Sequence, residues 1–473
     1  MRLVRYYRPV ASFYVENFGC RATQADGAAI ERQFQERGLA RASSPAQSKI
    51  VVLNTCTVTA SADQDARAAI RRIRRQNPGC EIIVTGCYAQ RAPEEVASLP
   101  GVNRVIGNSH KHQLADILLP PSIGGGAFVP LSRLAASGQR VTANEDTRIF
   151  VSDIFAHTEL MAAPVFDVGT STQRTRPNLK VQDGCDNRCS FCVIPSVRGQ
   201  SRSLPLGKIL AEMNALVHAG YREVVISGIN LGRWGRDLAR PLRIETLIHE
   251  ILGQTDLEKL RLSSVEPMDW SDKLIEMIAS TRRIAKHAHV PLQSGSDHVL
   301  RSMHRKYRPW HYREKIEKIR AAMPSAAIGA DVMAGFPGET ESDFAETRRL
   351  VESLPFTYLH VFTYSSRPGT PSDAMKDQVP IHIARERNRV LREIAAEKKL
   401  AFMRSMVGQT VEAITLNIVH RSPRGEFTEA LSDNYQKVLL TGLHEPNCWM
   451  MTQIEKADAT ALTGVPLPVC GEP

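Results

Sequence analysis

The sequence predicts an α/β protein made of three successive parts. Two long stretches alternate short β-branched runs with helical periods, as parallel strands joined by helices do, and the last part changes to closely spaced short strands. We therefore expect an N-terminal doubly wound parallel sheet, a central (β/α) partial barrel and a C-terminal small all-β barrel. The expected limits are 9–119 for the first domain, 120–176 for a connector, 177–406 for the second domain and 407–465 for the third.

The N-terminal part contains four runs of strand type separated by helical periods. Strands are expected at residues 13–17, 50–54, 81–85 and 102–106, and helices at 26–35, 60–76 and 93–99. The alternation then stops, because residues 124–126 are all glycine and Ser and Thr are frequent at 170–177. This composition is typical of a connector.

The central part contains six runs of strand type, each followed by a helical period. They lie at residues 179–182, 223–227, 259–264, 288–292, 328–333 and 358–363. Six such units predict a complete or partial barrel, whose reactive groups lie at the carboxyl ends of the strands. A long basic helix is expected at 381–406, and the strands of the last part at 410–418, 425–431, 437–440 and 448–455.

Charge and composition narrow the class of protein. The 473 residues include 60 Lys and Arg against 50 Asp and Glu, a net charge of +10, which suits a polyanionic partner such as nucleic acid and equally suits plain solubility. No apolar run approaches the roughly 18 residues that cross a bilayer, so no membrane segment is expected. The first residues lack the apolar core of a secretory signal, so we expect a cytoplasmic location.

Three cysteines form the most specific motif. Cys185, Cys189 and Cys192 follow the first strand of the central part in a C-x3-C-x2-C pattern. Three thiolates on one short loop can hold three corners of a cubane iron–sulfur cluster and leave the fourth iron open to a substrate. A structural zinc site is the alternative, although no second C-x2-C or histidine pair follows this loop. The odd total of nine cysteines argues against a complete disulfide framework.

A second set of cysteines is dispersed over the N-terminal part. Cys20, Cys56 and Cys87 each follow a different predicted strand. Because open parallel sheets gather their ligands at the carboxyl ends of the strands, these three thiols should converge and could hold a second cluster whose open iron carries sulfur. The alternative is that free cysteines serve as small core residues. That alternative is expected for the three remaining ones: Cys80, Cys448 and Cys470.

Further motifs surround these cysteines. The C-x3-C-x2-C loop continues as VIPSVRG at residues 193–199, and other stretches read VLNTCTVT at 52–59, VTGCYAQ at 84–90 and PLQSGS at 291–296. These residues resemble the radical S-adenosylmethionine methylthiotransferase family, and the resemblance covers essentially the whole chain in the family's order. It implies an N-terminal methylthiotransferase domain, a central radical core and a C-terminal TRAM domain that binds RNA.

The resemblance also implies two [4Fe-4S] clusters and S-adenosylmethionine as cofactors. The cluster of the C-x3-C-x2-C loop binds S-adenosylmethionine and cleaves it to methionine and a 5'-deoxyadenosyl radical, which abstracts hydrogen from an unactivated carbon. The auxiliary cluster of Cys20, Cys56 and Cys87 supplies the sulfur, methylated by a second S-adenosylmethionine. An electron donor such as flavodoxin or ferredoxin is implied as a partner.

Four residues around the barrel mouth are expected to contact S-adenosylmethionine. Gly228 and Asn230 end the second barrel strand, Glu266 follows the third, and Gly335 opens a glycine turn after a later one. Ordinary barrel-loop structure is the alternative for each of them. One position departs from the family, which usually has asparagine three residues after its first cysteine. Here Thr23 stands there; its oxygen can still accept a bond from a backbone N–H, so we expect an intact cluster with altered hydrogen bonding around its ligands.

Three basic groups are candidates for binding phosphates, with a solvated helix face as the alternative. Two of them are Arg67, Arg71, Arg74 and Arg75, which share one helix face, and Arg301, Arg305, Lys306 and Arg308. The third lies on the long helix that leads into the small β-barrel, and we expect it to grip RNA: Arg385, Arg387, Arg389, Arg392, Lys398, Lys399 and Arg404.

Three branches of the family differ in substrate. They act on threonylcarbamoyladenosine in tRNA, on isopentenyladenosine in tRNA, or on an aspartate of a ribosomal protein. The run HVFTYSSRPGTP at 360–371 looks most like the threonylcarbamoyladenosine branch, which implies C2 of that nucleoside at position 37, in the tRNA anticodon stem-loop, as the target. The net positive charge also favours tRNA over a basic ribosomal protein. A zinc-bound RNA-binding protein is the non-enzymatic alternative.

Overall fold

The computed structural model describes residues 11–119, 148–156, 175–422 and 425–467. The chain forms two compact units, one made of Met1–Met161 with Ser196–Gly199 and the other of the remaining residues. Most of the expected connector and Cys470 lie outside the described residues. No helix in the described part of the chain is both long and apolar enough to cross a membrane.

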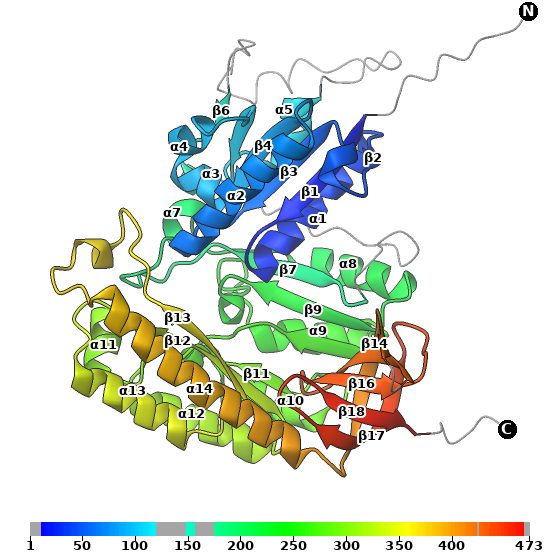
Figure 1. The fold of residues 1–473 in the computed structure, drawn as a ribbon. Helices are drawn as coiled ribbons and strands as arrows, with labels where there is room; N and C mark the ends of the chain where they lie inside the picture. Colours follow the sequence, from blue (N-terminus) through cyan, green and yellow to red (C-terminus); the bar gives the residue numbers. More distant parts are fainter. Residues whose placement is uncertain (1–10, 120–147, 157–174, 423–424, 468–473) are drawn as a thin grey trace, which may run out of the picture. The chain divides into compact units, whose positions relative to one another are not determined.

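The first unit contains a six-stranded, all-parallel sheet with the order β2-β1-β3-β4-β5-β6 (Figure 1). Its strands are β1 (Ser12–Asn17), β2 (Ala40–Arg41), β3 (Ile50–Thr55), β4 (Glu81–Gly86), β5 (Arg104–Gly107) and β6 (Ile149–Phe150). Its helices are α1 (Arg21–Glu36), α2 (Ala60–Gln76), α3 (Cys87–Arg91), α4 (Pro93–Ala97) and α5 (Leu114–Leu118). The predicted doubly wound sheet is confirmed.

Strand β3 shows why this sheet has helices on both faces. All six of its residues are buried. Val51 and Leu53 pack in one core with residues of α2, whereas Ile50 and Val52 pack in another with residues of α1 and α5. A parallel strand that is buried on both faces reads as a continuous apolar run, which is the signal that the sequence gives at this position.

The structure corrects the expected elements at their ends. Helix α1 begins at Arg21 rather than at residue 26, so that Cys20 is its N-cap residue. Strand β2 and helix α3 were not expected, and the last predicted strand begins two residues later, at Arg104. The start of α1 is not apolar on one face, because its buried residues include Thr23 and Asp26, and hydrophobic periodicity therefore misses it.

The second unit begins with an arc of strands that forms the partial barrel. Sheet β10-β9-β7-β8 and sheet β11-β12-β13 are linked by a parallel bridge between Leu260 and Ile284. The strands are β7 (Asn178–Asp183), β8 (Arg202–Ser203), β9 (Glu223–Gly228), β10 (Lys259–Leu262), β11 (His287–His289), β12 (Ala327–Ala334) and β13 (Tyr358–Thr363). All six expected strands are present, and the short β8 adds an antiparallel neighbour to β7.

Helices follow the strands of the partial barrel, as a (β/α) pattern requires (Figure 1). They are α7 (Ile194–Arg198), α8 (Leu206–His218), α9 (Ile244–Gln254), α10 (Asp272–Ser280), α11 (Asp297–Ser302), α12 (Pro309–Ala322), α13 (Glu341–Ser353) and α14 (Ile381–Ser405). Helix α14 packs along β13 and leads into the C-terminal barrel.

The last part of the chain is a closed five-stranded barrel, consistent with a TRAM-like domain. Its strands are β14 (Thr410–Ser422), β15 (Gly425–Ser432), β16 (Lys437–Thr441), β17 (Trp449–Ala457) and β18 (Leu462–Pro466). Strand β18 was not predicted, and it closes the barrel by pairing parallel with β16 and antiparallel with β17. Val438, Leu440 and Ile454 pack at its centre.

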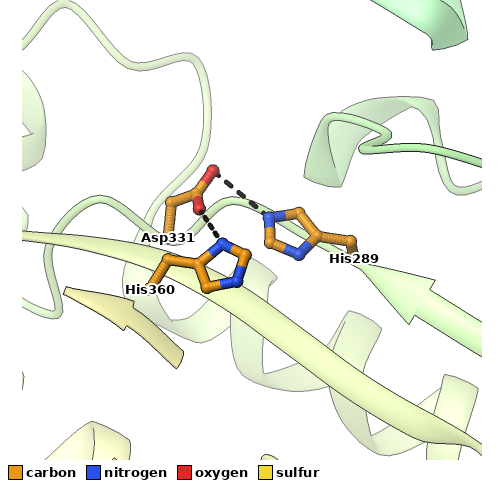
Figure 2. A group of neighbouring side chains, drawn as sticks. All are labelled: His289, Asp331 and His360. Atoms are coloured by element: carbon orange, nitrogen blue, oxygen red, sulfur yellow. Dashed lines mark ion pairs between the residues drawn. The ribbon is translucent and has the colours of Figure 1, made fainter. Parts of the chain in front are cut away.

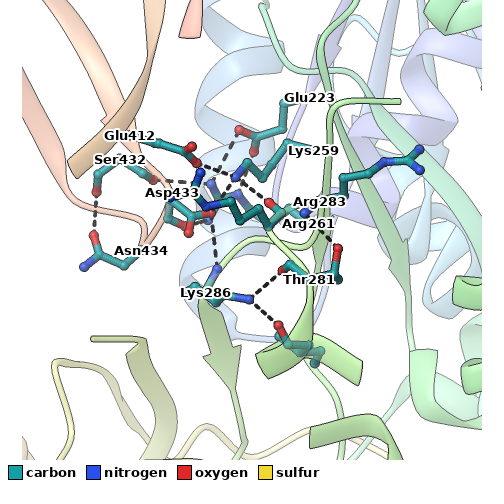
Figure 3. Close-up of polar contacts among 12 residues, drawn as sticks. Glu223, Lys259, Arg261, Thr281, Arg283, Lys286, Glu412, Ser432, Asp433 and Asn434 are labelled. Atoms are coloured by element: carbon teal, nitrogen blue, oxygen red, sulfur yellow. Dashed lines mark hydrogen bonds and ion pairs between the residues drawn. The ribbon is translucent and has the colours of Figure 1, made fainter. Parts of the chain in front are cut away.

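A buried ionic network joins the two barrels at the amino ends of β9 and β10 (Figure 3). Arg261 is fully buried; its Nε donates to Glu223 at 2.6 Å and its Nη1 to the carbonyl of Asp433 at 2.9 Å. Lys259 donates to Glu412 of β14 at 2.8 Å. Because breaking a buried pair is costly, this network fixes the small barrel against the partial barrel.

Candidate functional site

The dispersed cysteines lie at the carboxyl ends of the strands of the first sheet. Cys20 caps α1 after β1, Cys56 follows β3, and Cys87 begins α3 directly after β4. These three strands are neighbours and parallel, so their carboxyl ends meet. Gly19 has a φ of +94°, and a Cβ on it would lie 2.9 Å from the sulfur of Cys56. Only glycine lets the Cys20 loop approach Cys56 so closely.

The electrostatics of the first unit show that these thiols interact. Burial, together with the neighbouring Cys87 and Cys20, raises the pKa of Cys56 to about 12. Asn108 Nδ2 donates to Cys87 Sγ at 3.6 Å. Three converging thiolates are costly unless a cationic group is bound among them, and an iron–sulfur cluster supplies such a group. The donor set therefore fits the cluster that the family implies.

The Thr23 hydroxyl lies between a cysteine and an arginine side chain. It lies 3.5 Å from Cys20 Sγ and 3.4 Å from Arg198 Nη2, rather than against a backbone N–H. Arg198 comes from the VIPSVRG stretch, whose residues 196–199 belong to the first unit. The sequence gives no signal for this contact, because the two residues are far apart along the chain.

The second set of cysteines lies on one loop between β7 and α7. Cys192 N–H donates to the carbonyl of Cys189 at 3.1 Å, and Asn187 N–H donates to Cys185 Sγ at 3.4 Å. Burial raises the pKa of Cys185 and raises that of Cys192 to about 12. These thiolates too need a bound cation, so the loop fits an iron–sulfur cluster.

The end of α11 and the residues after it hold this loop in place. Ser190 N–H donates to the carbonyl of Met303 at 3.1 Å. The Ser190 hydroxyl donates to the backbone carbonyl of Ser302 at 2.7 Å. Arg305 Nη1 donates to Cys189 Sγ at 3.3 Å, and its Nη2 donates to Glu266. We expected Arg305 in a phosphate-binding group, but it is 7% exposed and its donors bond Cys189, Glu266 and Tyr307.

Two of the residues expected to contact S-adenosylmethionine lie beside the cysteine loop. A Cβ on Gly228 would come within 2.8 Å of Gln182 Oε1, which accepts from Asn230 N–H at 2.7 Å, so a larger residue would disturb this bond. Asn230 is 4% exposed and directs its Nδ2 to Cys185 Sγ at 3.7 Å. Its Oδ1 is buried without a hydrogen-bond partner among the described residues. A buried unpaired acceptor is costly, and a bound amino group would satisfy it.

A cavity of about 270 Å³ opens next to Asn230. It is lined by Asp186, Asn187, Ser201, Asn230, Arg233, Arg236, Asp237 and Lys306. Glu266 lines a second, much smaller hollow together with Asn187 and Cys189. The cavity offers carboxylates, amides and cations at the carboxyl ends of the barrel strands, the groups that a zwitterionic ligand with a ribose requires.

Gly335 has a structural explanation of its own. Its φ is +78°, and a Cβ would lie 2.3 Å from that of Ala384 on α14. Its N–H donates to Glu339 Oε2 at 2.7 Å. Close packing against α14 and a tight turn therefore account for this glycine, and its contact with a cofactor stays a prediction.

The basic helix α14 is only partly available for RNA. Arg387 is 6% exposed and pairs with Glu339 at 2.8 Å, so it is a structural residue. Arg392 and Lys399, in contrast, line a groove of about 460 Å³ along β13, together with His360 and Phe362. Phe362 is 44% exposed, so its ring is accessible from this groove.

A cluster of polar side chains from β11, β12 and β13 was not predicted from the sequence. Asp331 Oδ2 lies 3.2 Å from His289 Nε2, and its Oδ1 lies 3.3 Å from His360 Nδ1 (Figure 2). Tyr358 OH lies 2.9 Å from His289 Nδ1 and 2.7 Å from His287 Nε2. Although burial opposes ionisation, the two histidines that face Asp331 lower the pKa of its carboxyl. Two histidines and a carboxylate are also ligand types for a metal ion.

Comparisons with known proteins agree with this arrangement. The family model described as "Uncharacterized protein family UPF0004" matches residues 12–107, and the model "Radical SAM superfamily" matches 179–351. A radical S-adenosylmethionine methyltransferase, TsrM, from Kitasatospora setae has a similar fold, with a TM-score of 0.53 at 14% identity over 77% of this chain and 75% of that one.

Curated relatives extend over most of the chain. "Threonylcarbamoyladenosine tRNA methylthiotransferase MtaB" of Aquifex aeolicus is 34% identical over 91% of this chain and 97% of its own length. The protein of the same name from Bacillus subtilis is 34% identical over 92% of both. "tRNA-2-methylthio-N(6)-dimethylallyladenosine synthase" of Novosphingobium aromaticivorans is 32% identical over 85% of this chain and 86% of its own. The chain belongs to the family of radical S-adenosylmethionine tRNA methylthiotransferases.

Proposed function

We propose that this protein methylthiolates C2 of N6-threonylcarbamoyladenosine at position 37 of tRNA. The observation that carries the proposal is the presence of two separate three-cysteine sets, one at the carboxyl ends of β1, β3 and β4 and the other on the loop after β7. A radical methylase would need only the second set. A sulfur-inserting enzyme uses the first set as well, because sulfur must be held and delivered.

Two [4Fe-4S] clusters and S-adenosylmethionine are the proposed cofactors. Cys20, Cys56 and Cys87 would hold the auxiliary cluster, and Cys185, Cys189 and Cys192 the other. When bound, the clusters and S-adenosylmethionine supply radical hydrogen abstraction and a sulfur to insert.

The chain's own residues bind and orient these groups. Asn230 offers its unpaired Oδ1 to the ligand amino group, and Arg305 holds both Glu266 and the cysteine loop in place. Gly228 is proposed to let the cofactor approach the backbone closely, and Gly335 stays a proposed contact with the adenine end. Flavodoxin or ferredoxin is proposed as the electron donor.

The groove between α14 and β13 is proposed as a grip for the tRNA anticodon stem-loop. Arg392 and Lys399 can pair with phosphates, and exposed Phe362 can stack on an unpaired base. The TRAM-like barrel is proposed to add a second RNA contact. Its ionic attachment to β9 and β10 would keep the distance between the two RNA contacts constant.

The choice of nucleoside rests on sequence likeness. Relatives named for threonylcarbamoyladenosine and for dimethylallyladenosine both match over most of the chain. The HVFTYSSRPGTP run favours the first, and the second remains the alternative, ahead of a ribosomal aspartate.

The experiment is mass spectrometry of tRNA nucleosides from a strain that lacks the gene. Loss of the methylthio form of threonylcarbamoyladenosine, with unchanged dimethylallyladenosine derivatives, is the expected result, and the reverse pattern would assign the alternative. Iron, sulfide and zinc analysis of anaerobically purified protein tests the class: about eight irons per chain is expected. Zinc-containing, colourless protein would instead identify a non-enzymatic RNA-binding protein.

A further inference from the structure

We propose that Thr23, oriented by Arg198, donates a hydrogen bond to the Cys20 thiolate and thereby raises the reduction potential of the auxiliary cluster. Thr23 is then a positioning residue for the sulfur-supplying centre. The inference rests on the proposed function, because it requires a cluster on Cys20, Cys56 and Cys87.

The direction of the hydrogen bonds follows from the donors available. Arg198 Nη2 lies 3.4 Å from Thr23 Oγ1, and a guanidinium can only donate. The threonine oxygen therefore accepts from Arg198, and its own proton is left to point elsewhere. Cys20 Sγ lies 3.5 Å from that oxygen, and as a metal ligand it would be a thiolate, which can only accept. Arg198 therefore donates to Thr23, and Thr23 donates to Cys20.

Buried polar groups hold Thr23 and Arg198 in this arrangement. Arg198 Nη2 donates to Asp26 Oδ2 at 3.0 Å, and Lys111 Nζ donates to the same oxygen at 3.0 Å. Asn54 Nδ2 donates to the carbonyl of Thr23 at 2.7 Å. Thr23, Asp26, Lys111 and Arg198 are each at most 3% exposed. Because these residues are buried and hydrogen-bonded, the Thr23 hydroxyl keeps one orientation.

A fixed donor to a ligating sulfur has a known electronic consequence. It withdraws electron density from the sulfur and stabilises the reduced, more negative cluster, so the potential rises. The Arg198 guanidinium supports this donor, because its Nη2 lies 3.4 Å from Thr23 Oγ1 and occupies a lone pair of that oxygen. Arg198 also forms an ion pair with Asp26, and this pair fixes the position of the guanidinium beside Thr23.

The test uses the full chain with Cys185, Cys189 and Cys192 replaced by alanine, so that only the first set can hold iron. In this background Thr23→Val removes the hydroxyl and keeps the shape, and Thr23→Ser keeps the hydroxyl. Thr55→Val is the matched control, because the Thr55 hydroxyl lies one residue from Cys56 but donates to the carbonyl of Thr85. Readouts are the midpoint potential in an EPR-monitored titration and the rate of iron loss to a chelator.

Thr23→Val should shift the midpoint to a more negative potential and release iron about tenfold faster, as loss of a supporting bond commonly does. Thr23→Ser and Thr55→Val should behave like the parent. An unchanged potential in Thr23→Val, or an equal shift in Thr55→Val, would overturn the inference while the cluster itself remained established. A parent that binds no iron at all would overturn the proposed function, and this inference with it.

Discussion

The two cysteine sets are built in opposite ways. The set of the second unit lies on one continuous loop, within a stretch of eight residues from Cys185 to Cys192. The set of the first unit comes from three separate loops, at the ends of β1, β3 and β4. One loop can present three ligands by local turn geometry, whereas three loops present them only when the whole sheet has formed. The first site is therefore the more dependent on tertiary structure.

Replacing one cysteine in each set should separate the two roles most strongly. Cys189→Ala should abolish both S-adenosylmethionine cleavage and thiolated product. Cys87→Ala should abolish the product but leave cleavage detectable, because the second set remains intact. Quantification of 5'-deoxyadenosine and of methylthiolated nucleoside in the same reaction measures both. Methylthiolated product from Cys87→Ala would contradict the assigned role of the first set.

A glycine pair tests whether the first site depends on close loop approach. Gly19→Ala places a Cβ 2.6 Å from Cys56 Cβ at a φ of +94°, whereas Gly38→Ala has a φ of +79° and meets nothing within 4 Å. Both should lose about 1 kcal/mol from the left-handed backbone alone. Only Gly19→Ala should also lose most of the iron of the first site. Iron analysis in the background without Cys185, Cys189 and Cys192 distinguishes them, and equal iron contents would refute the crowding argument.

Two asparagines offer a matched pair, one for each set. Asn108 donates to Cys87 at 3.6 Å, and Asn230 donates to Cys185 at 3.7 Å. Each alanine variant should weaken iron retention about tenfold at its own site and leave the other unchanged. The EPR spectra of the two clusters measure this, each recorded in a background in which the three cysteines of the other set are replaced by alanine. An effect of Asn108→Ala on the second set would show that the sites are not independent.

Low pH should have a smaller effect on the stability of the fold. This effect can be measured in the second unit alone. All four tryptophans, Trp234, Trp270, Trp310 and Trp449, belong to that unit, so their fluorescence reports only on it. Although burial would raise it, hydrogen bonds from Ser296 and Thr340 lower the pKa of Asp343 to about 2.

The sign of the effect follows from this lowered pKa. A carboxyl with a lower pKa in the folded state stabilises the fold above its unfolded value near 3.9, and this contribution is lost as the pH falls toward 2. Asp343→Asn should lower the free energy of unfolding by about 1 kcal/mol at pH 7. The variant should also lose less stability than the parent between pH 4 and pH 2. Urea unfolding followed by tryptophan fluorescence at several pH values is the measurement. A variant with the parental pH dependence would contradict it.

The regular parts of the fold were predictable because local patterns carry them. Strand β3 and helix α2 begin and end within one residue of the expected positions, since β3 is a continuous buried run and α2 repeats its buried residues at helical spacing. The start of α1 was missed because polar Thr23 and Asp26 face inward there. Strand β18 was missed because its pairing with β16 is distant in sequence and closes the barrel only after β17 is in place.

The candidate sites divide in the same way. The six cysteines, Gly228 and Asn230 could be chosen from sequence because they follow strands. Arg305 and Arg387 were expected among cations that bind phosphates or RNA, but tertiary packing buries them against Glu266 and Glu339. The partner of Thr23 could not be predicted, because Arg198 reaches the first unit from a distant stretch of the chain.

The sequence by itself determined most of the strands and helices, the three architectural parts and the two sets of thiols, because periodicity and motif spacing are local properties. Tertiary structure decided which charged side chains are buried, which hydroxyl faces Cys20, and where His289, Asp331 and His360 meet. Those outcomes depend on side chains that are brought together from distant elements, and the interaction free energy of such a contact exists only once the packed fold has excluded water from it.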